Sequence, residues 1–255
     1  MSSRNMHIKG QGKSFAKALK RDIGREKEIV EESWEVKPGK SILMNLTRQK
    51  LFRYLCEYPC SSLSTIARDI QLSPPTAIWH LKLLIERDLI SHSRHGGQRI
   101  FFPREMVNQD SIKILSLLTN EKVRRIYIGI IDTPGIKQSE LTQVLGFRHQ
   151  SINSFTKKLE NEELITKVKD GKFIRYYPTK KLLELEIAQR GKLKEFRAWI
   201  IKSLKFDGVN PKLIRATDRE LIVQITSGKK LKSLKLSVNP YISILIDKAR
   251  FLSEL

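Results

Sequence analysis

Two Gly-Lys-Ser tripeptides, at residues 12–14 and 39–41, are the groups in the chain that most suggest nucleotide chemistry. A phosphate-binding loop also needs a glycine five residues before its second glycine, because backbone N–H groups freed by glycine hold the phosphates. His7 and Trp34 occupy those two positions. The spacing therefore argues against nucleotide hydrolysis.

Cysteine and histidine side chains suggest metal binding as a second kind of chemistry. Cys56 and Cys60 are the two cysteines of the chain, and they lie four residues apart. Structural zinc needs four ligands in a tetrahedron, but there is no second cysteine pair, and His80 and His92 are not at metal-ligand spacing. We interpret the cysteines as one thiol in a helix and one in a turn, and His80 as a core or capping residue. Because no catalytic triad or carboxylate pair stands out either, the sequence predicts no enzyme, no metal and no cofactor.

The charge of the chain points to a different class of partner. Its 255 residues include 48 Lys and Arg against 27 Asp and Glu, which gives a formal net charge of +21. Such an excess predicts attraction to a polyanion such as DNA, RNA or an acidic membrane surface. The longest apolar run, residues 126–131, is too short to cross a bilayer, and no apolar signal segment is visible. We expect a soluble, cytoplasmic, nucleoid-associated protein in a reducing compartment.

The chain repeats itself with an offset of 75 residues. Pro59 is matched by Pro134, and Gly96 is matched by Gly171. Three short segments keep the same offset without a gap: Leu63-Ser-Thr-Ile66 with Gln138-Ser-Glu-Leu141, Asp88-Leu-Ile90 with Glu163-Leu-Ile165, and Phe102-Pro103 with Tyr177-Pro178. Matches at one fixed period indicate two copies of one domain.

Each copy is predicted to contain three helices followed by a hairpin. In the first copy Thr47 and Ser62 are suitable caps for two helices, and Ser73-Pro74 places an N-cap before a proline at the first position of a third helix. That third helix is predicted over residues 74–87, and its hairpin over strands 89–94 and 98–102. In the second copy the predicted helices are 121–131, 138–145 and 149–161, and the predicted strands are 164–169 and 172–177 around Asp170-Gly171.

This order of elements resembles the winged helix-turn-helix domain. The segment Ser73-Pro-Pro-Thr-Ala-Ile-Trp-His-Leu-Lys-Leu-Leu84 resembles the recognition helix of ArsR- and MarR-like regulators, as found in many archaea. It nearly completes the pattern Ser-x-x-Thr-(small apolar)-x-x-His-Leu-x-x-Leu, and the second copy keeps the spacing with Phe155 in place of His80. The resemblance covers about residues 46–104 and 121–178, and it implies two tandem DNA-binding domains. The metal sensing of ArsR-like proteins is not implied, because the ligands for it are missing.

A recognition helix reads the major groove with one face while its opposite face packs inside the domain. In the first such helix we expect Ala77, Leu81 and Leu84 in the core. The predicted DNA-contacting residues of this copy's helix are Ser73, Pro75, Thr76, Trp79 and Lys82, with Ile78 beside them. A hydroxyl such as that of Thr76 suits a base or a phosphate, whereas Trp79 equally fits packing against the hairpin or another subunit.

The second recognition helix carries more polar groups. Its predicted DNA-contacting residues are Arg148, Gln150, Ser151, Ser154, Lys157 and Lys158. Gln150 has the groups for a bidentate pair with adenine, and Arg148 suits guanine or a phosphate.

The two hairpins, which would be the wings, add further charge. The predicted contributors are Arg94, His95, Gln98 and Arg99 in the first hairpin and Lys167, Lys169, Lys172 and Arg175 in the second. Arg94 and Arg99 suit a narrow A·T-rich groove.

The two ends of the chain lie outside the resemblance. Residues 1–40 are interpreted as a basic arm, either simply solvated or following DNA phosphates. Residues 179–206 are predicted to form one long connecting helix, and residues 207–255 a small module of about three strands and a helix that begins at Asn239-Pro240. The module could form a homodimer, bind an effector or dock a partner.

The predicted fold is mostly α with a small share of β, in the α+β class. It consists of an arm (residues 1–40), two winged helix-turn-helix domains (41–106 and 107–178), the connecting helix (179–206) and the module (207–255). The predicted function is a sequence-specific transcription regulator that binds double-stranded DNA and no membrane. Two alternatives stay open, namely a nucleoid protein with little sequence preference and a set of protein-interaction modules. RNA is disfavoured because no aromatic stacking sheet is evident.

Overall fold

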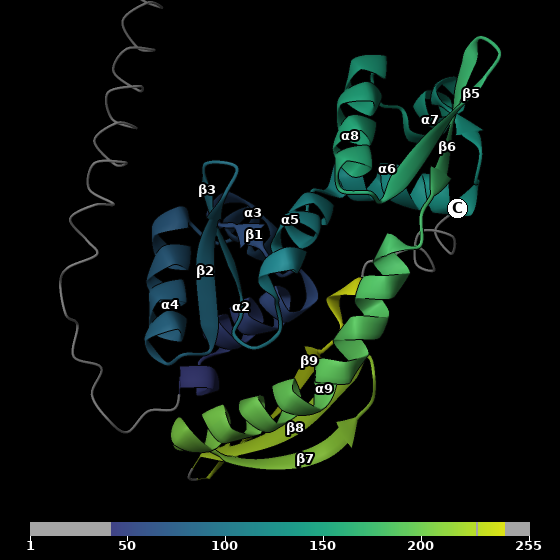
Figure 1. The fold of residues 1–255 in the computed structure, drawn as a ribbon. Helices are drawn as coiled ribbons and strands as arrows, with labels where there is room; N and C mark the ends of the chain where they lie inside the picture. The colour runs from purple at the N-terminus through teal and green to yellow at the C-terminus, as the bar shows by residue number, and fades with distance from the viewer. Residues whose placement is uncertain (1–41, 228, 243–255) are drawn as a thin grey trace, which may run out of the picture. The chain divides into compact units, whose positions relative to one another are not determined.

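The structure, a computed structural model, describes residues 42–227 and 229–242, which belong to one unit of the chain spanning residues 40–255 (Figure 1). The predicted basic arm, both Gly-Lys-Ser tripeptides and most of the predicted last helix lie outside the described residues. Within the described residues, no helix combines the length and the apolar character that a bilayer span requires.

Residues 46–103, which we call the first unit, form three helices and a three-stranded sheet. Side-chain caps begin two of the helices, because Ser62 Oγ accepts from the backbone N–H of Thr65 (3.3 Å) and Ser73 Oγ accepts from that of Thr76 (3.2 Å). With the short 3₁₀ helix that precedes it, the unit contains η1 (Ile42–Met44), α2 (Leu46–Glu57), β1 (Ser61–Ser62), α3 (Leu63–Ile70), α4 (Pro74–Glu86), β2 (Ile90–His95) and β3 (Gln98–Pro103). The sheet order is β1-β3-β2.

The start of α2 differs from the prediction. Thr47 lies inside this helix, so its predicted capping role is wrong. The cap is Asn45, whose Oδ1 accepts from the backbone N–H of Arg48 (3.1 Å). The helix begins at Leu46, so the residue just before it is the one placed to satisfy the free N–H groups of the first turn.

Residues 121–178, which we call the second unit, repeat each element of the first unit 75 residues later in number. For example, α4 spans Pro74–Glu86 and its counterpart α8 spans His149–Asn161. The elements are α6 (Glu121–Asp132), β4 (Ile136–Lys137), α7 (Gln138–Leu145), α8 (His149–Asn161), β5 (Ile165–Asp170) and β6 (Phe173–Pro178). The sheet order, β4-β6-β5, is also that of the first unit.

The tight turns repeat as well. Gly96 and Gly171 both adopt φ +57° in the hairpin turns, where a left-handed backbone favours glycine. Each hairpin begins one residue later than predicted, and the helix before it explains the shift. The N–H of Leu89 bonds to Leu84 O (3.0 Å) and that of Leu164 to Leu159 O (2.9 Å), so both leucines end a helix instead of starting a strand.

Two regions complete the described chain. A helix that the sequence analysis did not predict, α5 (Gln109–Leu118), links the two units. The predicted long helix is present as α9 (Lys181–Phe206), and the three predicted strands of the module are β7 (Asn210–Ala216), β8 (Glu220–Ser227) and β9 (Lys230–Ser237), with β8 in the centre. At the predicted last helix, Asn239 Oδ1 accepts from the backbone N–H of Tyr241 (3.2 Å), which is the expected N-cap.

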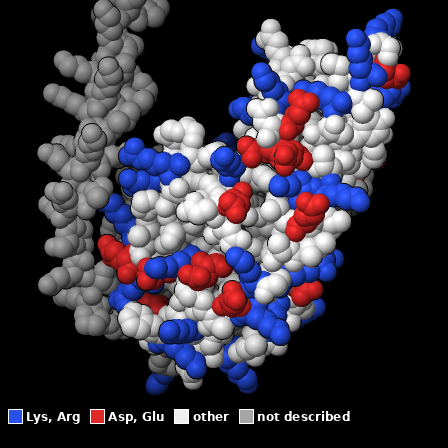
Figure 2. Space-filling view, in the orientation of Figure 1, with Lys and Arg blue, Asp and Glu red and all other residues white. Residues whose placement is uncertain are grey.

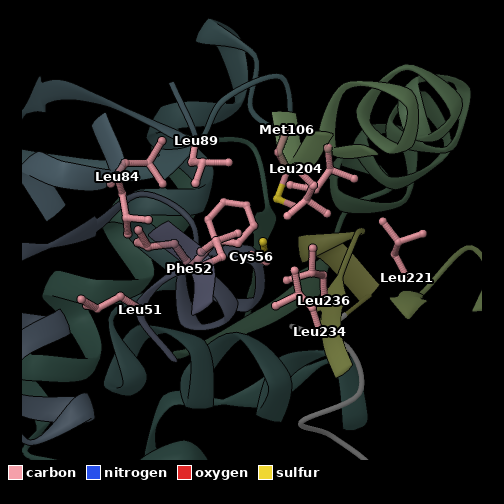
Figure 3. Packing of buried hydrophobic residues seen from close by; sticks show 14 of the residues in the cluster. Leu51, Phe52, Cys56, Leu84, Leu89, Met106, Leu204, Leu221, Leu234 and Leu236 are labelled. Carbon is pink, nitrogen blue, oxygen red and sulfur yellow. The ribbon is translucent and has the colours of Figure 1, made fainter. Parts of the chain in front are cut away.

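Two hydrophobic clusters hold these elements together. The first joins Phe52 and Leu84 of the first unit to Leu204 of α9 and to Leu234 and Leu236 of β9 (Figure 3). Alternation along β8 and β9 buries one face of the module's sheet fully, as predicted, through Leu221, Val223, Ile225, Leu234, Leu236 and Val238. The second cluster combines α5 with the second unit and also takes in Cys60, Ile100 and Phe102 from the first unit.

Polar contacts reinforce the first cluster. The carboxylate of Asp207, at the end of α9, accepts from the backbone N–H of Ile42 (2.6 Å), and Lys232 Nζ donates to Met44 O (2.8 Å). The first unit and the C-terminal module are therefore packed into one body, with α4 on the opposite side of the core from the module's sheet (Figure 1).

Candidate nucleic-acid interface

The cap and the core together set the orientation of α4. Ser73 begins the helix and Pro74 takes its first position, where a missing N–H has no consequence. Ala77, Leu81 and Leu84 are fully buried, which confirms the predicted core face. Because 3.6 residues make a turn, this burial directs the intervening positions to the outside.

The outer face of α4 is accessible and largely apolar. Pro75, Thr76 and Trp79 are exposed, with 53% of Trp79 accessible, and Lys82 is half-buried. Thr76 has a competing partner, since its hydroxyl lies 2.7 Å from that of Ser73. The Trp79 ring lies 4.6 Å from the ring of His80, centroid to centroid, and packs on its own helix.

The outer face of α8 is more polar. Exposed side chains cover most of the predicted set, namely Arg148, Gln150, Ser154, Lys157 and Lys158, and Ser151 is half-buried. His149 and Asn153, which the sequence analysis did not single out, are exposed on the same helix. The start of α8 is held in place by Gln138 of α7, whose Nε2 donates to His149 O (3.3 Å).

The first hairpin, β2 with β3, brings two predicted arginines together. Arg94 and Arg99 are directly opposite in the ladder, so they share one face of the hairpin. Like charges at such a pair repel each other, and an anion between them would remove the repulsion. Gln98 is exposed beside the turn and is paired in the ladder with His95.

The second hairpin, β5 with β6, separates its predicted basic residues into two kinds. Lys169 and Lys172 are exposed. Lys167 and Arg175 are engaged in ion pairs, with Glu160 of α8 (2.6 Å) and with Asp170 (2.6 Å). The prediction that all four act as wing charges is therefore corrected for these two, whose main contacts are within the unit.

A hollow of about 430 Å³ lies beside the first hairpin and reaches the second unit. Gln98 of the hairpin and Phe155 of α8 both line it, together with Arg68 of α3 and Lys122 of α6. The structure thus brings one predicted DNA-contacting residue of the first unit, Gln98, near the recognition-like helix of the second.

The histidines and cysteines of the first unit lie in apolar surroundings. Burial, and secondarily the charge of Arg48, lowers the pKa of His80, which is consistent with the predicted core role. Burial raises the pKa of the Cys56 and Cys60 thiols far above the ordinary range, so both are inert thiols near neutral pH. Among the described residues there is no group of three or more His, Cys, Asp or Glu side chains that could hold a metal ion.

One basic side chain near the second hairpin escaped the sequence analysis. Lys137 pairs with Arg175 across β4 and β6, and its Nζ lies 4.7 Å from the centre of the Phe173 ring. The two residues are far apart in the chain, and the two-residue strand β4 that places Lys137 has no sequence signal of its own. The repeat offset points only to Ser62 as its counterpart.

The comparisons with known proteins point to one functional class. No family model matches the chain. Over 143 residues the chain is 25% identical to a Methanocaldococcus jannaschii protein described as the uncharacterized HTH-type transcriptional regulator MJ1398. The match covers 56% of this chain and 36% of that protein, so the chain spans little more than a third of the relative's length.

Similarities to solved structures are weak. Reduced HlyU from Vibrio cholerae gives a TM-score of 0.27 at 19% identity, covering 30% of this chain and 83% of that one. Lactococcus lactis ZitR, a zinc-responsive MarR family member, gives 0.23 at 16% identity, covering 58% and 95%. A cysteine-to-serine mutant of ZitR in complex with DNA gives 0.23 at 19% identity, covering 57% and 93%. Scores this low do not establish a shared overall fold.

Proposed function

We propose that this chain is a sequence-specific transcription regulator that binds double-stranded DNA with its two units as tandem winged helix-turn-helix domains. The observation that carries the proposal is that α4 and α8, at the same place in two matching units, each leave an outer face accessible beside a basic hairpin. A helix of this kind fits the major groove, and a hairpin beside it reaches the backbone or the minor groove. The relative described as an HTH-type regulator supports the same class.

The proposed domain division follows from this assignment. It comprises the arm at residues 1–40, the domains at 41–106 and 107–178, the connecting helix at 179–206 and the module at 207–255. The outer faces of α4 and α8 differ in sequence, so a single chain is expected to prefer an asymmetric site. We place the protein in the cytoplasm on the nucleoid, as a regulator of the kind found in archaea.

The module is the proposed dimerisation region. Its edge strand β7 exposes Leu213 (53%) and Ile214 (54%), and an edge strand presents unpaired backbone groups to a partner. A homodimer formed there would turn the asymmetric site into a palindrome. Size-exclusion chromatography with light scattering would show a species of twice the 29.6 kDa chain mass.

Selection of bound fragments from random DNA, followed by footprinting, tests the proposal. We expect a recurring sequence with an affinity about 10³-fold or more above that for random DNA. A ratio near one would contradict a regulator and leave the second candidate, a nucleoid protein with low sequence preference. One observation favours that candidate, namely the few base-reading groups on the apolar outer face of α4.

Binding is also expected to depend strongly on salt. Replacing one lysine on each helix, Lys82→Ala with Lys157→Ala, should weaken binding on all sequences and reduce the salt slope by about 1.8, at roughly 0.9 per phosphate contact. The matched control removes two exposed lysines from other helices, Lys113→Ala with Lys202→Ala, and should change the slope less. Equal slopes for the two double variants, measured by fluorescence anisotropy, would mean that these helix faces do not contact phosphates.

A further inference from the structure

The tip of the second hairpin is apolar where that of the first is polar. Val168, Phe173 and Ile174 are 46%, 42% and 45% exposed. At the corresponding positions, 75 residues earlier, the first hairpin has Ser93, Gln98 and Arg99. The strand bounds of the two hairpins correspond residue for residue, so the backbone does not require these apolar side chains.

Lysines surround the apolar tip. The Nζ of Lys137 lies 4.7 Å from the centre of the Phe173 ring, and that of Lys172 lies 5.3 Å from it. Lys169 is exposed one ladder position from the turn, and the carboxylate of Asp170 is paired with Arg175 (2.6 Å). Figure 2 shows blue side chains gathered at this outer end of the β5–β6 hairpin.

Both faces of the tip are apolar. Ile174 lies opposite Lys169 and shares a face with Lys167, whose ion pair to Glu160 shows that this face is the one toward α8. Phe173 lies opposite Asp170 on the other face. The tip is therefore a thin wedge with an isoleucine on one side, a phenylalanine on the other and ammonium groups around both.

We propose that Phe173 and Ile174 insert as an apolar wedge between base pairs next to the site of α8, unstack that step and bend the duplex. The inference rests on the proposed function. Apolar side chains inserted in this way kink DNA, and the bend allows more of the protein surface to contact it. Lys137, Lys169 and Lys172 would neutralise the flanking phosphates.

The charge pattern selects DNA over a second copy of the chain as the occupant. Two copies meeting at this tip would place lysines against lysines around a small apolar contact. A duplex offers both a polyanionic backbone and apolar base faces, which match the ammonium groups and the two apolar side chains.

The test transfers the chemistry of the first hairpin to the second. The variant Phe173→Gln with Ile174→Arg carries the residues that positions 98 and 99 already hold in a hairpin of the same bounds, and thermal unfolding checks that it folds. We expect a duplex carrying end-attached donor and acceptor dyes to lose its protein-induced bend. We also expect 2-aminopurine at the wedged step to lose its fluorescence rise, and binding to weaken roughly tenfold, as the burial of one large apolar side chain would lead to.

The substitution also adds a positive charge, which separates the wedge from a purely electrostatic contact. If the tip only touches phosphates, the variant should bind more tightly, show a salt slope larger by about 0.9 and keep the same bend, and the wedge would be wrong. A wild-type chain that shows no bend and no 2-aminopurine rise would contradict it as well. If the double variant does not fold, Ile174→Ala gives the same readouts with a smaller change in shape.

Two results separate this inference from the proposed function. A wild-type protein that binds duplex DNA without bending or unstacking it would reject the wedge and leave the DNA-binding proposal standing. A protein that binds no duplex at low salt would reject both. A change in oligomeric state caused by Phe173→Gln with Ile174→Arg would assign the tip to contact between copies and overturn the wedge. As a matched control, Gln98→Ala in the first hairpin should leave the bend unchanged.

Discussion

The two units have the same backbone frame and opposite surfaces. In the first unit the helix α4 presents an apolar face with Trp79, and the hairpin presents Arg94 and Arg99. In the second unit α8 presents Gln150 and Lys157, and the hairpin has an apolar tip. The difference indicates that caps, turns and buried leucines suffice to maintain the frame, so the exposed positions are free to specialise for different parts of one DNA site.

The units also differ in what they pack against. The core of the first unit continues into α9 and the module's sheet, whereas that of the second continues into α5. Three residues of the first unit's sheet region, Cys60, Ile100 and Phe102, belong to the second cluster. The two cores are thus in contact, and we expect them to unfold together.

The largest expected effect comes from matched core truncations, Leu84→Ala in the first unit and Leu159→Ala in the second. Both leucines are fully buried, so each variant should lose about 3 kcal/mol of unfolding free energy through lost burial and the cavity left behind. Urea denaturation, followed by tryptophan fluorescence and by far-UV circular dichroism, measures the loss. If Leu159→Ala shifts the circular dichroism transition and leaves the fluorescence transition in place, the units unfold independently and the shared-core interpretation is wrong.

A smaller effect is expected on base preference. Gln150→Ala should relax specificity at one base pair by about 1–3 kcal/mol, since a bidentate contact to adenine would be lost. Thr76→Ala in the first unit should change preference less, because the Thr76 hydroxyl is already engaged with Ser73. Competitive binding to a library of single-base variants of the selected site measures both. Equal losses of preference would mean that the polar difference between α4 and α8 has no role in reading.

Helix capping offers a third comparison at similar or lower energy. Ser73 caps α4 with its side chain, whereas Arg148 at the start of α8 makes no side-chain cap bond. Ser73→Ala should therefore cost about 1 kcal/mol of unfolding free energy, and Arg148→Ala a few tenths at most. Chemical denaturation of the two variants side by side tests the difference, and a larger loss for Arg148→Ala would contradict it.

The smallest expected effect is a pH dependence confined to the first unit. Burial lowers the pKa of His80 below its ordinary value of 6.5, so the unfolded chain takes up this proton first as pH falls. Its contribution to stability is complete above about pH 6.5 and decreases below that value. His80→Phe, which installs the residue found at position 155, should flatten this decrease between roughly pH 6.5 and 5. The pKa of His92 is also lowered, by burial and by Arg99, but His92 is present in both proteins and cancels in the difference.

Most of the fold was predictable because its signals are local. Ser62 and Ser73 caps, the proline at position 74 and the glycines at the hairpin turns fix helix starts and turns from neighbouring residues alone. The buried face of α4 followed from helical periodicity. The cap at Asn45 and the helix α5 were missed, because weak local signals competed there with equally suitable alternatives.

The candidate interface was predictable only in part. Periodicity identifies which side chains point outward, but it does not say which of them have partners. Lys167 and Arg175 are held by Glu160 and Asp170, and Lys137 reaches the Phe173 ring, because the sheet brings these positions together.

The sequence by itself determined the duplication, the order of elements, the positive charge and the accessible faces of the two helices, since repeats, caps and periodicity act between residues close in the chain. Only the tertiary structure decided which basic residues are engaged in ion pairs, which unit shares its core with the C-terminal sheet, and where apolar and basic side chains meet at one hairpin tip. Those features depend on contacts between residues that are distant in the chain, and such contacts form only when the strands and helices pack.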